Sequence, residues 1–201
     1  MGVILRRGPP QRWRLTLWNT KQDHFEGGQW FRGRIYPEKC DVSPNGKLFI
    51  YFAGKFRPRD IAWTWTAVSR PPYLTALALW PIGQPWGGHG VFVDNDTVIV
   101  TIGGDRDPGH PPGPLRMIED SCLKKDDPLR NRKPSRLNAW QWVPALQRAE
   151  NIIPWRKTFG DLTLGAEGHF SSPRRSLYTL SRADGEPMRH TGLIGISGVD
   201  W

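Results

Sequence analysis

The chain has 201 residues, 38% of them hydrophobic, and a formal net charge of +9 at pH 7. This length suffices for one domain with a buried core, and we expect a single all-β domain over residues 1–201. The 22 glycines and 19 prolines exclude long helices and favour short strands joined by turns. No apolar stretch approaches the ~18 residues of a membrane span, so we expect a cytoplasmic protein with no membrane contact.

The first predicted strand covers residues 11–19, where apolar residues alternate with arginine and threonine. Such alternation is typical of a strand with one buried and one solvent-exposed face. Because neighbouring side chains of a strand point to opposite faces, Trp13 is expected to pack in the core and Arg14 to face solvent. The glycines at 27 and 28 are expected to break the chain before a second strand over 29–36.

A turn joined directly to a strand follows in residues 41–52, which read Asp-Val-Ser-Pro-Asn-Gly-Lys-Leu-Phe-Ile-Tyr-Phe. Pro44 presets φ, and Asn45 and Gly46 tolerate the positive φ values of a tight hairpin turn. Residues 48–52 are aromatic or aliphatic and carry no charge, which predicts a strand. The segment brings no nucleophile, metal ligand or phosphate-binding loop with it.

This turn and strand resemble the Ser-Pro-Asp-Gly-Lys turn and strand of WD40-like and TolB-like β-propeller blades. Asp184 and Gly185, after the apolar residues 177–180, are a weaker echo of a blade's hairpin. The resemblance implies four-stranded antiparallel blades arranged as a binding platform. No repeat of about 40–50 residues is visible in the chain. The expected fold is therefore all-β and loop-rich, either a small or partial β-propeller or a β-sandwich, with at most one or two short helices.

Further strands are predicted in the rest of the chain, for a total of roughly eight to ten. They cover residues 61–68, 73–80, 91–93, 97–102, 161–164 and 176–181. The first of them is expected to turn Trp63 and Trp65 to one face and Thr64 and Thr66 to the other, with the indoles in the core or in an exposed aromatic patch.

Two segments of the C-terminal half are expected to lack strands. Residues 118–136 are highly charged, which predicts a long disordered loop. Residues 144–150 follow a proline, which favours a short helix.

Signatures of catalysis and of metal binding are absent from the sequence. It holds no Gly-x-Ser-x-Gly elbow, no phosphate-binding loop with lysine and no His-Glu-x-x-His helix, so we expect no enzyme, no cofactor and no metal. The alternatives left open are a metal site formed by His89, His110 and Cys122, and an enzyme that gathers Asp and His groups from distant loops. Cys40 and Cys122 match no zinc or redox spacing, and we expect two buried thiols, with one disulfide as the alternative.

Cations stand beside aromatic residues at three places, residues 12–14, 30–34 and 155–157. Proteins that bind single strands combine such groups, since bases stack on aromatics while cations contact phosphates. Neighbours within a strand face apart, however, so Trp13 and Arg14 are not expected to share a groove. The leading hypothesis is a non-catalytic binding or scaffolding subunit of a larger assembly, which engages a protein partner with an acidic surface. The alternative is a module that binds single-stranded nucleic acid or another polyanion. The residues expected to contact either partner are Arg12, Arg14, Arg32, Arg34, Trp86, Trp155, Arg156 and Lys157.

Overall fold

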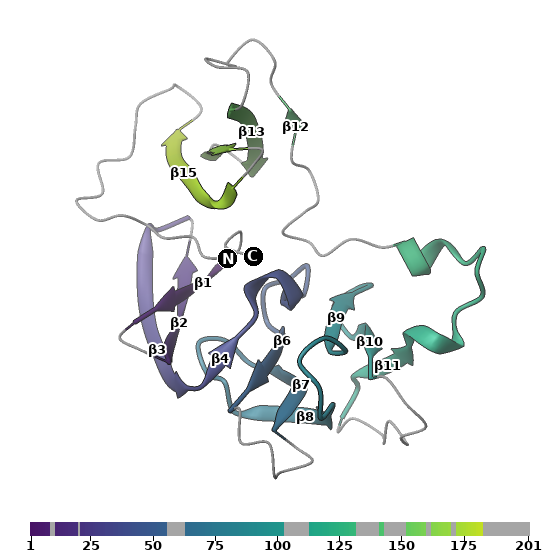
Figure 1. Cartoon of the computed structure of the whole chain (residues 1–201). Coiled ribbons are helices and arrows are strands. Elements are labelled where there is room, and N and C mark those ends of the chain that lie inside the picture. Colours follow the sequence, from purple (N-terminus) through teal and green to yellow (C-terminus); the bar gives the residue numbers. More distant parts are fainter. Residues whose placement is uncertain are drawn as a thin grey trace. The chain divides into compact units, whose positions relative to one another are not determined.

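The structure is a computed structural model (Figure 1) that describes residues 1–8, 11–19, 21–55, 63–102, 113–131, 141–142, 152–159, 162–169 and 172–182. Contacts divide the chain into two compact units, Met1–Arg136 and Leu137–Trp201. The described residues form fifteen strands and three short 3-10 helices, which confirms the all-β, loop-rich fold. The strands outnumber the eight to ten expected, because three consist of only two residues and others, such as Gly2–Arg7 and Arg116–Glu119, lie where no strand was expected. A single domain over the whole chain stays a prediction.

The first sheet is an antiparallel meander of three strands in chain order. They are β1 (Gly2–Arg7), β2 (Arg12–Asn19) and β3 (His24–Arg32). Trp13 is buried and Arg14 is partly exposed, as the alternation predicts. The expected break at Gly27 and Gly28 is wrong, since both lie inside β3. The β2–β3 register shifts beside them, between Arg14 and Thr16.

The second sheet contains the predicted turn and strand. Its order is β4 (Arg34–Ile35), β6 (Phe49–Gly54), β7 (Thr64–Ser69) and β8 (Ala76–Pro81), and β5 (Asp41–Val42) also pairs with β6. The amide of Gly46, at φ 72°, donates to the Ser43 carbonyl at 2.8 Å and closes the turn between β5 and β6. The residues of β6 are all buried, because both faces of this sheet are covered.

The expected orientation of β7 is only partly right. Thr64 and Thr66 are completely buried, while Trp63 and Trp65 are half-buried. The Trp63 indole donates to the Gly83 carbonyl at 2.9 Å, and Trp65 meets Phe31 edge-on at 5.9 Å. The threonine face, to which the sequence assigned neither core nor solvent, is thus the more buried of the two, because a further sheet covers that side of β7.

That third sheet consists of β9 (His89–Phe92), β10 (Thr97–Thr101) and β11 (Arg116–Glu119). The strands predicted over 91–93 and 97–102 are largely confirmed, and β9 and β10 pair antiparallel as a hairpin. The charged loop expected over 118–136 instead begins with the end of β11, which pairs parallel to β10. Two 3-10 helices follow, η2 (Asp120–Cys122) and η3 (Pro128–Asn131), and residues 132–136 lie outside the described part.

Two hydrophobic cores hold the first unit together. One lies between the second and third sheets and includes Ile50, Phe52 and Val98, while the other lies between the first and second sheets and includes Leu15 and Tyr51. The second sheet is thus the middle layer of three. The outer face of the first sheet, opposite its buried Trp13 and Leu15, belongs to neither core.

Residues of β5 and of the turn that follows it also connect the second sheet to the third. The Asp41 carboxylate, 3% exposed, accepts a hydrogen bond from the Phe92 amide at 2.9 Å. The Asn45 amide donates to the Asn95 side chain at 2.9 Å, so the turn after β5 contacts the turn after β9. The segment that predicted a local hairpin therefore also joins two sheets.

Cys40 directly follows the 3-10 helix η1 (Pro37–Lys39). Its thiol is buried and donates to the Tyr36 carbonyl at 3.1 Å. Cys122 is exposed and no disulfide joins the two. The expectation of two buried thiols is wrong for Cys122, because η2 turns its side chain to solvent.

The second unit is an antiparallel sheet in the order β12 (Gln141–Trp142), β13 (Ile152–Phe159), β14 (Leu162–His169) and β15 (Ser172–Arg182). The predicted strands over 161–164 and 176–181 are parts of β14 and β15. The helix expected over 144–150 lies outside the described residues. Within the described ranges, no helix is long and apolar enough to span a bilayer.

Candidate anion-binding surface

The register of the first sheet brings several arginines and one tryptophan to its outer face. Residues directly opposite each other in an antiparallel pair project from the same side of the sheet. Arg6 lies opposite Arg14, Arg12 opposite Arg32, and Arg14 opposite Trp30. Because Trp13 and Leu15 fill the inner face of β2, these five side chains form an outer surface, which we call the arginine face: Arg6, Arg12, Arg14, Trp30 and Arg32.

At the centre of the arginine face, Arg14 and Trp30 form a cation–aromatic pair. The guanidinium carbon of Arg14 lies 5.7 Å from the centre of the indole, and its Nε donates to the Gly28 carbonyl at 3.4 Å. Trp30 is 48% exposed. The pair forms across strands, which removes the objection that neighbours on one strand face apart.

Glycines make room for this pair. A Cβ at Gly27 would collide with the Arg14 guanidinium, and a Cβ at Gly8 would lie 2.8 Å from the indole of Trp30. On the other side of β3, a Cβ at Gly28 would collide with the Pro72 carbonyl, which accepts the Gln29 amide at 3.1 Å. Glycine at 27 and 28 therefore lets β3 continue where larger residues would push away both neighbours.

The arginine face carries concentrated positive charge. Two of its cross-strand pairs set arginine opposite arginine, an arrangement that lowers the stability of a sheet. Arg6, Arg12 and Arg32 are exposed to solvent, and Arg14 is half-buried. An anion bound here would neutralise charges that repel one another.

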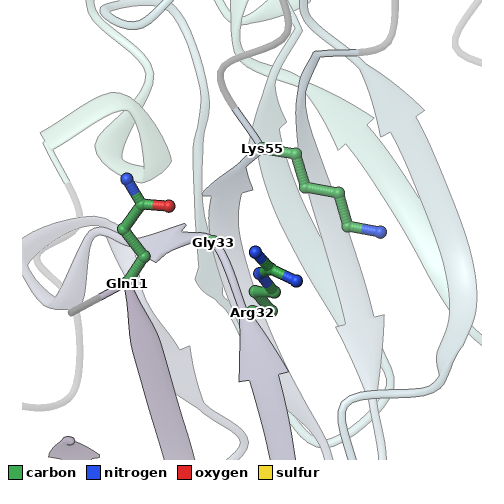
Figure 2. A pocket seen from close by; sticks show the side chains of 4 residues that line it. All are labelled: Gln11, Arg32, Gly33 and Lys55. Carbon is green, nitrogen blue, oxygen red and sulfur yellow. The ribbon is translucent and has the colours of Figure 1, made fainter. Parts of the chain in front are cut away.

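A hollow of about 360 Å³ adjoins the arginine face at the end of β3. Among the described residues, its lining is Gln11, Arg32, Gly33 and Lys55, which we call the corner hollow. Figure 2 shows Arg32 beside Gly33 in the middle, with Gln11 on one side and Lys55 on the other. Gly33 has φ +148°, and a Cβ there would lie 2.6 Å from the Gly54 carbonyl.

Arg34 and Trp86 belong to a second group of cations and aromatics, around Tyr36. The Arg34 guanidinium lies 4.6 Å from the centre of the Tyr36 ring. Lys39 Nζ lies 4.8 Å from the centre of the Phe52 ring and donates to the Trp86 carbonyl at 2.6 Å. That hydrogen bond fixes the backbone beneath the Trp86 indole, which is 85% exposed.

The third predicted cluster, Trp155, Arg156 and Lys157, lies on β13 of the second unit. Its backbone pairs with β14, with Arg156 opposite Gly165. The side chains of this cluster are outside the described part of the structure, and its role in binding stays a prediction.

Titratable groups do not gather into a metal site within the described ranges, where no three His, Cys, Asp or Glu residues lie close enough to hold an ion. His110, one of the three residues considered for such a site, lies outside those ranges. Desolvation lowers the pKa of His89, the charge of Asp120 opposes this shift, and Lys39 adds to it. His89 lies at the start of β9, 3.5 Å from the Thr101 hydroxyl.

Sequence reasoning missed Arg6, Gln11 and Lys55 as members of these surfaces. A signal for Arg6 exists in the sequence, because the glycine and prolines at 8–10 suit a hairpin turn that sets Arg6 opposite Arg14. No comparable signal exists for Lys55, since it reaches the corner hollow through the pairing of β6 with β4.

Comparison with protein-family models, with curated proteins and with solved structures finds no match for this chain. The resemblance to β-propeller blades therefore stays a prediction.

Proposed function

We propose that the protein is a non-catalytic module that binds single-stranded nucleic acid on the arginine face. The observation that carries the proposal is the cross-strand contact of Arg14 with Trp30, at 5.7 Å. Bases stack on exposed aromatic rings whatever their sequence, and arginines hold the phosphates beside them. The arginine face combines both groups on one side of one sheet.

The placement of the cations suits an extended ligand. Arg12 and Arg14 are two residues apart on β2, so their Cα atoms are separated by about 7 Å along the strand. Arg6 and Arg32 extend the charge to the strands on either side. The net charge of +9 adds long-range attraction for a polyanion, which raises the rate of encounter.

Fluorescence anisotropy with a labelled oligothymidine at several salt concentrations tests this function. On single strands, log K falls against log salt with a slope of about −0.7 for each neutralised phosphate, so four arginines give a slope near −3. Trp30→Leu is expected to weaken binding by about 1–3 kcal/mol, the range for loss of one stacked base. Trp86→Leu is the matched control and leaves binding unchanged. Absence of binding at low salt would overturn the proposal.

A second candidate function is the engagement of an acidic protein within a larger assembly, with the chain as a scaffolding subunit. It is favoured by Trp86, an 85% exposed indole whose backbone is held by Lys39. Exposed tryptophans in fixed positions are frequent anchors of protein interfaces. The resemblance of residues 43–52 to β-propeller blades, which commonly serve as binding platforms, also fits this second proposal.

Purification of the tagged protein from its native host separates the two functions. A stoichiometric partner that Trp86→Ala loses and Trp30→Leu retains supports the protein interface. Retention of the same partner by Trp86→Ala contradicts it. Nuclease treatment before purification removes partners that are tethered only through nucleic acid.

A further inference from the structure

The corner hollow brings together two cations that are far apart in the sequence. Arg32 ends β3, and Lys55 directly follows β6. Arg34 pairs with Gly54 across β4 and β6, so the next positions outward, Gly33 and Lys55, come to the same corner. The convergence therefore follows from sheet register, and both side chains line one hollow of about 360 Å³.

The backbone around the hollow has two uncommon conformations joined by a hydrogen bond. Gln11 has φ 61°, in the left-handed region that residues other than glycine seldom occupy. Its carbonyl accepts the Gly33 amide at 2.8 Å, and Gly33 itself has φ +148°. Residues held in such conformations cluster at ligand sites, where the surrounding structure fixes their geometry.

The chemistry of the lining favours an anion. Within the described part of the chain, its charged members are Arg32 and Lys55, both cations, and Gln11 adds a side-chain amide. Arg32 also belongs to the arginine face, so a strand lying on that face reaches the hollow. A terminal phosphate carries about −1.5 to −2 charges at pH 7, more than a phosphodiester inside the strand.

We propose that the corner hollow binds the terminal phosphate of a single strand that lies on the arginine face, a proposal that rests on the nucleic-acid function above. Lys55 and Arg32 contact the phosphate oxygens, and Gln11 contacts the terminal nucleotide. The module is then selective for phosphorylated ends. A phosphate monoester can stand at either the 5′ or the 3′ end of a strand, and the experiment shows which of the two ends the hollow binds.

Anisotropy competition with three oligothymidines of about eight nucleotides tests the selectivity, one with a 5′-phosphate, one with a 3′-phosphate and one with hydroxyl ends. We expect one of the phosphorylated strands to bind about tenfold tighter than the hydroxyl strand, the effect of one added charge-assisted hydrogen bond. Lys55→Gln abolishes this preference, so that the phosphorylated and hydroxyl strands bind this variant with equal affinity. Lys47→Gln, in the exposed turn after β5, is the matched control and keeps the preference.

Equal affinity for the three strands overturns the terminal-phosphate proposal and leaves the nucleic-acid function standing. A preference that survives in Lys55→Gln overturns it as well. If none of the strands binds, the proposed function fails. Titration of the protein with inorganic phosphate then tests separately whether the corner hollow binds an anion. Shifts of the Gly33 amide resonance that disappear in Lys55→Gln support an anion site, whereas unchanged spectra exclude it.

Discussion

Ionisation of the buried Tyr51 phenol is expected to lower the stability of the protein as the pH rises above 10. The side chain is 3% exposed, and its hydroxyl donates to the Leu74 carbonyl at 2.6 Å. Burial raises the pKa of Tyr51 from 10.0 to about 12, against an opposing hydrogen bond with Trp65. The folded state therefore holds the phenol proton more tightly than the unfolded state. This contribution is complete below pH 10 and is lost as the pH rises through about 12.

The size of the effect follows from the shift. Two pKa units correspond to about 2.7 kcal/mol over the whole titration, and about 2 kcal/mol of this unfolding free energy is expected to be lost between pH 10 and pH 12. Tyr51→Phe lacks the ionisable group but leaves the buried Leu74 carbonyl without its donor, which costs about 1 kcal/mol at pH 8. The two stability curves should therefore converge with rising pH and meet near about pH 11.

Urea unfolding followed by tryptophan fluorescence, between pH 8 and pH 11.5, measures both curves. Tyr73→Phe is the control, since that side chain is 56% exposed and should run parallel to the wild type. Absorbance at 295 nm reports the phenolate independently. Parallel curves for the wild type and Tyr51→Phe, or folded protein in which every tyrosine titrates near pH 10, would refute the reasoning.

Three further predictions concern other buried or exposed groups. Asp41→Ala removes the acceptor of the buried Phe92 amide and should lower the unfolding free energy by about 2 kcal/mol in urea titrations. Because desolvation lowers the pKa of His89, although the residue is exposed, the protein should lose a small amount of stability as the pH falls below the ordinary value of 6.5, and His89→Gln should reduce the difference between pH 7.5 and pH 5.5. Cys122 should react with a thiol reagent in the native protein, whereas Cys40 should react only after unfolding.

Each of these outcomes has a control that separates it from a general effect. Asp126→Ala, in an exposed turn, should leave stability unchanged. A pH dependence that is the same in His89→Gln and in the wild type would contradict the assignment to His89. For the thiols, Cys122→Ser should abolish the native reaction, and a remaining fast reaction would show that Cys40 is accessible.

Predictions that depend on neighbouring residues agree best with the structure. The turn over 43–47 and the hairpin of β9 and β10 follow from prolines, glycines and asparagines that act within a few residues of themselves. Strand β11 was missed because its partner is a parallel strand that ends before residue 102. The burial of Thr64 and Thr66 was not foreseen for a related reason, since alternation shows which residues share a face and not that a third sheet covers it.

In the candidate site, too, local patterns identified single residues, while the pairing of distant strands decides which residues lie together. Arg12, Arg14 and Arg32 were recognised from their aromatic neighbours in the sequence, but the tryptophan that contacts Arg14 is Trp30, on another strand. Register decides which residues share a face, and it depends on turn geometry and on a shift beside Arg14. Lys55 joins Arg32 only through the pairing of β4 with β6, which no local pattern specifies.

Gly27 and Gly28 leave β3 without side chains at two consecutive positions. The Arg14 guanidinium occupies the place of one missing Cβ, and the Pro72 carbonyl occupies the other. The backbone of β3 alone therefore separates the Arg14 guanidinium, on the outer surface, from Pro72, in the loop that leads into β8. The Arg14 guanidinium and the Pro72 carbonyl thus lie against consecutive residues of one strand, with no side chain of that strand between them. A side chain at position 28 would therefore have to displace backbone, whereas one at position 27 would have to displace only the flexible end of Arg14.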